Sequence, residues 1–241
     1  MVKTSINLLL VFFLFGFSAA AQQVVNDPNA EVRAASGFHA VSVSSGIDLY
    51  LTPGNEEAVV ISADDKVRSR IIVEVKNGTL KIYYDWKNNI RISWSNNKKP
   101  MKAYVSFKQL KSVSASGGSD VSVVNGELNA DNLDISCSGG SDFTGSVSAT
   151  NLTVDLSGGS DADLRGKATK MDANISGGSD IDAYGLSLEH CTINASGGSD
   201  ATLNVSVKLV ANASGGSDID VKGKCEITKN ASGASEIRRR D

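Results

Sequence analysis

Seven carboxylates recur at nearly equal spacing in the second half of this 241-residue chain, each at the end of a five-residue unit. The unit reads Ser-Gly-Gly-Ser-Asp in six copies and Ser-Gly-Ala-Ser-Glu in the last. Carboxylates bind calcium, and pairs of them cleave glycosidic bonds. They are therefore the first candidates for chemistry. The seven residues are Asp120, Asp142, Asp161, Asp180, Asp200, Asp218 and Glu236.

The spacing of these units predicts a repeat fold. Successive units begin 22, 19, 19, 20, 18 and 18 residues apart, and a fixed period of this kind is typical of stacked structural repeats. Apolar and polar residues alternate around each unit, as in a strand with one face turned inward. We therefore predict an all-β fold, a right-handed parallel β-helix (solenoid). Its short coils, of roughly 19 residues, stack at the strand spacing of about 4.8 Å.

Each unit is predicted to be a corner, because its glycines permit turns and its Ser and Asp side chains can hydrogen-bond backbone amides. We expect three short strands per coil and a narrow interior without a ligand cavity. Four asparagines that precede corners are expected to stack from coil to coil: Asn174, Asn194, Asn212 and Asn230. In the fifth coil the predicted inward set is Ala201, Leu203, Val205, Val207, Leu209, Ala211 and Ala213.

Carboxylates stacked at strand spacing repel one another, so something must offset this repulsion. Backbone amides at the corner could do so, and so could calcium bridging Asp120, Asp142, Asp161, Asp180, Asp200 and Asp218. The units only partly match calcium-binding nonapeptide coils, since the third glycine of that pattern is missing. The structural corner is therefore favoured. No cofactor is predicted, and Ca²⁺ is the alternative.

The chain begins with a segment that is typical of export. Lys3, an apolar run over 6–17 and three alanines at 19–21 match a secretory signal peptide over residues 1–21. We expect an exported protein of the periplasm, cell surface or medium, with no transmembrane segment after cleavage. Residues 22–35 are predicted to be a loose polar leader. Residues 36–241 then form one solenoid domain, with a β-rich N-terminal part over 36–112 and repeat coils over 113–241.

Aromatic residues cluster at the end of the N-terminal part. Asn77-Gly78 predicts a type I′ hairpin between strands at 71–76 and 79–84. A long loop over 86–100 follows. Four aromatic residues in and just before this loop could form a contact platform for sugar or protein. They could instead cover the open edge of the first coil, which is the favoured interpretation. The residues are Tyr83, Tyr84, Trp86 and Trp94.

A family resemblance rests on the segment Phe-His-Ala-Val-Ser-Val-Ser-Ser-Gly-Ile-Asp-Leu-Tyr-Leu-Thr-Pro-Gly at 38–54, followed by Val-Glu-Val at 73–75 and Asn-Gly-Thr-Leu-Lys-Ile at 77–82. Together with the repeats, these resemble the head GIN domain family of auto-transporter adhesins, common in Bacteroidetes-type bacteria, over roughly residues 36–236. The name-giving Gly-Ile-Asn is here Gly46-Ile47-Asp48. The resemblance implies a secreted β-helical protein and brings no catalytic residues.

Charge and cysteine content narrow the function classes. The formal net charge is −3, made up of +1 from Lys3, +4 over 22–112 and −8 over 113–241. An acidic chain without a basic face disfavours nucleic-acid binding. The asymmetry could support a homo-oligomer, although an ordinary solvated surface is favoured. Cys137, Cys191 and Cys225 occupy apolar strand positions and are predicted to be buried free thiols.

No catalytic motif accompanies the carboxylates. We therefore predict a non-catalytic, adhesin-like interaction protein of the cell envelope, whose partner is a surface glycan or protein. The alternatives are a carbohydrate-active enzyme of the β-helix type and a calcium-stabilised periplasmic scaffold. Three arginines at 238–240 could discourage end-to-end stacking or could grip an anionic surface.

Overall fold

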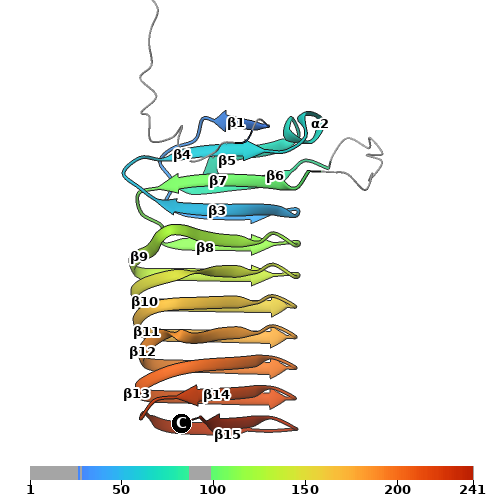
Figure 1. Cartoon of the computed structure of the whole chain (residues 1–241). Helices are drawn as coiled ribbons and strands as arrows, with labels where there is room; N and C mark the ends of the chain where they lie inside the picture. Colours follow the sequence, from blue (N-terminus) through green and yellow to red (C-terminus); the bar gives the residue numbers. More distant parts are fainter. Residues whose placement is uncertain (1–26, 28, 87–98, 241) are drawn as a thin grey trace, which may run out of the picture.

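The repeats wind into one parallel β-solenoid of about seven turns of roughly 19 residues (Figure 1). This computed structural model describes residues 27, 29–86 and 99–240. Within these residues the one helix is the single turn α2 (Asp65–Arg68). The predicted all-β solenoid is confirmed. The segment read as a signal peptide lies outside the described residues.

Each full coil is one long strand that hydrogen-bonds in parallel to the coils before and after it. These strands are β9 (Val121–Ser138), β10 (Phe143–Gly158), β11 (Ala162–Gly177), β12 (Ile181–Gly197) and β13 (Asp200–Gly215). The solenoid ends with β14 (Asp218–Lys222) and β15 (Glu226–Ala231), which both pair with β13, and with β16 (Glu236–Arg239), which pairs with β14 one step further along. The expected three short strands per coil are therefore replaced by one strand that bends without leaving the ladder.

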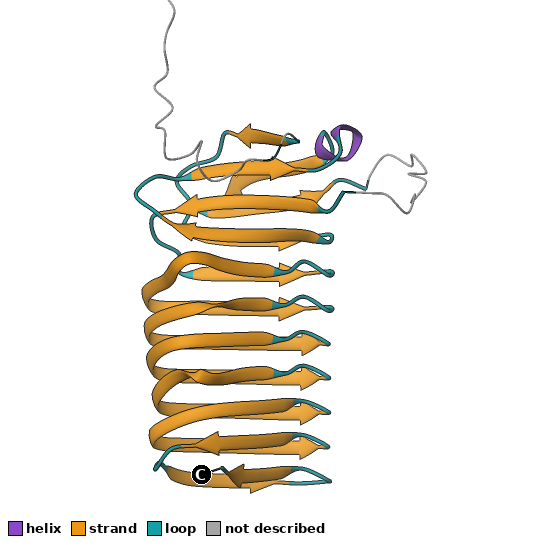
Figure 2. Cartoon of the chain, in the orientation of Figure 1, coloured by secondary structure: helices purple, strands orange, loops and turns teal. Residues whose placement is uncertain are grey.

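Two opposite edges run along the solenoid (Figure 2). The loops between strands stack along one of them, which we call the corner edge and which carries the Ser-Gly-Gly-Ser-Asp units. The continuous strands turn along the other, which we call the bend edge, at residues 129–131, 148–150, 167–169, 187–189 and 206–207.

The interior is filled by the inward residues of the alternating pattern. Phe143 is the largest fully buried side chain, and in the fifth coil six of the seven residues predicted to face inward are buried. Val207 is the exception, with 49% of its surface exposed. The pairs Leu188–Val205 and His190–Lys208 enclose one residue in β12 but two in β13. In β13 residues 206–208 are all exposed and the alternation resumes in the same phase at Leu209, so the prediction for Val207 was wrong.

The coil pattern continues into the N-terminal part through four parallel strands: β2 (Ala40–Ser44), β3 (Ile47–Pro53), β7 (Met101–Phe107) and β8 (Ser112–Ser116). Ser45 and Gly46 form a corner here, with φ of 73° and 71°. The Ile47 backbone N–H donates to Ser119 Oγ at 3.0 Å, which joins this corner to the first repeat unit.

Antiparallel strands cover the N-terminal end. Strand β4 (Ala58–Ser62) pairs with β7, and β1 (Ala30–Arg33) pairs with β4. The hairpin of β5 (Ile71–Lys76) and β6 (Thr79–Tyr84) turns at Asn77 and Gly78, both at positive φ, which confirms the predicted turn. Strand β1 contradicts the prediction that 22–35 is loose throughout, because the open edge of β4 recruits it. Among the described residues, no helix is long and apolar enough to cross a membrane.

Acid is expected to loosen β1. The Asp27 carboxylate accepts hydrogen bonds from the Ser62 hydroxyl and from Asn29, which lower its pKa from 3.8 to about 2. Since the folded pKa is depressed, this contribution to stability is complete above the unfolded value and is lost as the pH falls from 3.8 to about 2. Hydrogen exchange of β1 amides should therefore accelerate over this window. Asp27→Asn should show weaker protection already at neutral pH, and a β1 exchange rate independent of both changes would contradict the anchor.

The cysteines are expected to be unreactive in the folded protein. Cys137, Cys191 and Cys225 are all buried free thiols, as predicted. Burial raises the pKa of Cys137 and of Cys191 to about 12, so their thiolate forms are scarce at about pH 8. Iodoacetamide should label all three only after denaturation. Rapid labelling of the folded chain would mean that the coils open.

Candidate functional site

The predicted carboxylate ladder exists at the corner edge, and it is held by backbone amides. The backbone N–H of each Asp donates to Oδ1 of its counterpart in the preceding coil, from Asp142 to Asp120 through to Glu236 to Asp218, at 3.0 to 3.3 Å. One oxygen of each acceptor carboxylate is thus used to join coils. The backbone amides named by the structural interpretation are thus the donors to the ladder.

A buried serine ladder lies directly behind the aspartates. The second serine of each full unit is completely buried: Ser119, Ser141, Ser160, Ser179, Ser199 and Ser217. The Oγ of such a serine accepts the backbone N–H of the preceding coil's serine, as in Ser119 N–H to Ser141 Oγ at 3.1 Å. The sequence indicated these bonds but not that only the second serine is buried. The predicted asparagine stack is present from Asn174 to Asn212, with links of 2.9 Å.

Calcium lacks a ligand cluster in the described part of the chain, where no group of three or more His, Cys, Asp or Glu converges. The ladder supplies one carboxylate per coil and joins, at its N-terminal end, to Asp48. Burial raises the pKa of Asp48, and the neighbouring Asp120 carboxylate raises it further. The corner edge therefore has the properties of a structural ladder.

The C-terminal arginines close this ladder. Arg238 contacts Asp218, Asp220 and Glu236 at 2.8 to 3.2 Å, and Arg240 contacts Asp220 at 2.9 Å. Burial raises the pKa of Asp220, but the hydrogen bonds from Arg240 and Arg238 outweigh it and lower the pKa overall. These two arginines are thus engaged by acidic groups of their own chain, which disfavours the idea that they grip an anionic surface.

The four aromatic candidates do not form a shared platform among the described residues. Tyr84 is buried, with Trp86 against its ring at a centroid distance of 4.6 Å. Tyr83 lies on the opposite face of β6, where its hydroxyl donates to Glu74 at 3.2 Å. Trp86 is exposed, and Trp94 lies outside the described residues. Tyr84 therefore covers the end of the core, and the platform interpretation was wrong for this residue.

A different aromatic pair was missed. Tyr50 of β3 stacks on Tyr104 of β7 with ring centroids 5.1 Å apart, and Lys102 Nζ lies 5.8 Å from the Tyr50 centroid. Both tyrosines are outward residues of strands whose buried positions alternate with them. Their alternation was visible in the sequence, but their pairing depends on the register between β3 and β7.

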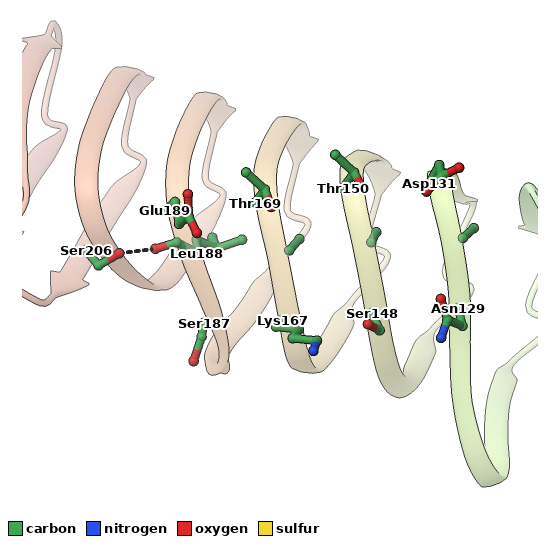
Figure 3. Close-up of a pocket in the computed structure, with 13 residues that line it drawn as sticks. Asn129, Asp131, Ser148, Thr150, Lys167, Thr169, Ser187, Leu188, Glu189 and Ser206 are labelled. Atoms are coloured by element: carbon green, nitrogen blue, oxygen red, sulfur yellow. Dashed lines mark hydrogen bonds between the residues drawn. The ribbon is translucent and has the colours of Figure 1, made fainter.

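The bend edge carries a groove of about 410 Å³ that crosses the five coils of β9 to β13 (Figure 3). Its floor includes Ala130, Ala149, Ala168 and Leu188, which are paired from coil to coil. Polar side chains flank this floor in two rows. One row is Asn129, Ser148, Lys167 and Ser187, and the other is Asp131, Thr150, Thr169 and Glu189.

The groove's polar side chains differ from those of the corner edge in how they are used. Among the described residues, none supplies a hydrogen bond or ion pair to the side chains of Asp131, Lys167 or Glu189. The register also passes from Ala149–Ala168 directly to Asn151–Lys170, so the ladder skips Thr150 and Thr169 where the chain turns. The bend edge thus presents polar groups that the coils do not use. Sequence reasoning missed it because these rows share no repeated residue.

Comparisons with known proteins agree on the fold. A putative adhesin from Bacteroides fragilis shares 24% identity at a TM-score of 0.77, covering 88% of this chain and 96% of its own. A putative adhesin from Parabacteroides distasonis shares 18% identity at 0.71, with coverage of 88% and 96%. A putative lipid binding protein from the same species shares 19% identity at 0.65, with coverage of 89% and 98%. No curated protein matches. The model of the family described as "Putative auto-transporter adhesin, head GIN domain" matches residues 37–225, and the chain therefore belongs to this family.

Proposed function

We propose that this protein is an exported, non-catalytic, adhesin-like binding protein of the cell envelope. The observation that carries the proposal is the groove on the bend edge, which crosses five coils and offers unengaged polar side chains, such as Asp131, Lys167 and Glu189, on four of them. A surface of this length suits a large extended ligand. The family description and the export pattern over residues 1–21 support the location.

The spacing of the carboxylates favours binding over glycoside cleavage. The carboxylates lining the groove are Asp131 and Glu189, in coils three steps apart, which corresponds to about 14 Å at the strand spacing. Cleavage requires two carboxyl groups about 5 to 9.5 Å apart. A rigid solenoid cannot close this difference by a small movement, so the groove is better suited to holding a polymer than to hydrolysing it.

Adhesion can be tested directly. Beads coated with the purified mature chain should adhere to bacterial or host cells, and a strain lacking the protein should adhere less than its parent. Protease treatment of intact parent cells should release peptides from the solenoid while a periplasmic control protein stays whole.

Two results would contradict the proposal. Protection of the protein until the outer membrane is broken would contradict a surface adhesin and favour a periplasmic scaffold. Beads that adhere no better than beads coated with an unrelated acidic protein would contradict the binding function itself.

A further inference from the structure

We infer that the groove of the bend edge binds an extended, uncharged polysaccharide chain that runs along the solenoid axis. The inference rests on the proposed binding function and gives it a site and a ligand class.

The groove is longer than a single cavity. A second depression of about 180 Å³ is lined by Gln109, Leu110 and Lys111 and shares Asn129 and its two following residues with the first. The two depressions adjoin at these residues, and we call them together the channel, whose lining runs from Lys111 to Ser206. At one coil per step, five steps of about 4.8 Å give a channel of about 24 Å. An extended polymer would occupy the whole length, whereas a small molecule would fill only a part of it.

The walls repeat once per coil, and this favours a sugar polymer over a peptide. Hydroxyl groups stand on both sides of the floor, as Ser148 and Thr150 do in β10 (Figure 3). The Asn129 amide lies on one side, and the Asp131 and Glu189 carboxylates lie on the other. Hydroxyls both donate and accept, which matches the hydroxyls on the two sides of a sugar ring. A peptide would present its backbone groups about every 3.3 Å, out of step with walls that repeat at about 4.8 Å. It would also cross the strands, so it could not extend their ladder.

The charges of the channel favour an uncharged chain. Lys111, Asp131, Lys167 and Glu189 alternate in sign along it, so no stretch offers the field of one sign that a polyanion or polycation would need. The alanines of the floor leave room for the ring of a sugar to approach the backbone.

The test is a glycan array that carries neutral and anionic oligosaccharides of several lengths, probed with the mature protein and matched variants. Thr150→Arg places a long side chain in the channel. Thr144→Arg makes the same change on the same strand, at an exposed position outside the channel. Thr169→Arg repeats the block one coil further along. All three positions are exposed, so the melting temperatures of the variants should stay close to that of the parent.

We expect binding to neutral glycans that strengthens with chain length. Thr150→Arg and Thr169→Arg should weaken it at least about tenfold, while Thr144→Arg leaves it unchanged. Binding to no glycan, to anionic glycans alone, or equally in all variants would overturn the inference. If the coated beads still adhere to cells in that case, the binding function stands and only the site or ligand class fails. If the beads do not adhere either, the function fails as well.

Discussion

Replacing Gly177 with alanine is expected to lower the free energy of unfolding by about 2 to 5 kcal/mol, from two separate costs. Gly177 has φ of 86°, where a Cβ is strained by about 1 to 2 kcal/mol. The added Cβ would also lie 2.6 Å from Gly158 O and 3.1 Å from Gly158 N. That backbone cannot withdraw, because its carbonyl accepts the Gly178 N–H at 2.9 Å in the coil ladder. Chemical denaturation measures the loss.

Gly178→Ala is the matched control one residue away. The nearest atom to its added Cβ would be Gly158 O at 3.9 Å, and Gly178 does not have the positive φ of Gly177. The last unit carries Ala234 at the equivalent position, where its backbone N–H still donates to Gly215 O at 2.7 Å. We expect a change of less than about 1 kcal/mol.

Gly140→Ala separates the two costs. Gly140 is also the second glycine of its unit, but it has φ of 74° with 3.9 Å of clearance to the nearest atom. Only the conformational cost of about 1 to 2 kcal/mol should apply. The expected order of destabilisation is therefore Gly177, then Gly140, then Gly178. Equal losses at Gly177 and Gly178 would contradict the close approach of neighbouring coils at the corner edge.

The repeat coils could be predicted from the sequence because each coil is defined locally. A two-residue alternation determines which side chains face inward, and the spacing of the units determines the coil length. Val207 is a position at which the alternation fails to predict whether a side chain faces inward. The alternation was read without a break, whereas the register between β12 and β13 inserts an extra residue at the bend. Such a shift depends on the neighbouring coil and has no local sequence pattern.

The N-terminal end was harder to predict, because its elements depend on tertiary pairing. Strand β1 is short and mostly exposed, and it forms because the edge of β4 would otherwise be open. Tyr83 and Tyr84 are adjacent in sequence but lie on opposite faces of β6. Aromatic residues that are clustered in the sequence are therefore not clustered in the structure.

The candidate site shows that repeated sequence units reveal structural positions more readily than binding positions. The Asp ladder is conspicuous in the sequence because every coil needs the same hydrogen bond to the next. The groove is inconspicuous because its rows vary from Asp131 through Thr150 and Thr169 to Glu189. In a solenoid, repetition is expected wherever coils stabilise one another, and variation is allowed wherever they do not. The positions available for ligand specificity are therefore those that a repeat search discards.

Ser160→Ala is the second large effect that we expect, with a loss of about 1 to 3 kcal/mol. The fully buried Ser160 hydroxyl accepts the Ser141 N–H at 3.3 Å and donates to the Ser157 carbonyl at 3.1 Å. Alanine removes both bonds and leaves the Ser141 N–H buried without its acceptor. The penalty is mainly the desolvation of this N–H, since the lost side-chain volume is small.

Two further variants test whether the hydroxyl itself is responsible. Ser157→Ala alters the first serine of the same unit, which is exposed, and should change stability by no more than about 0.5 kcal/mol. Ser160→Cys keeps a side chain of similar shape but offers a weak acceptor, so it should lose most of what alanine loses. If the cysteine variant is as stable as the parent, packing rather than hydrogen bonding holds the corner. If it resembles the alanine variant, hydrogen bonding by the buried serine ladder joins the coils.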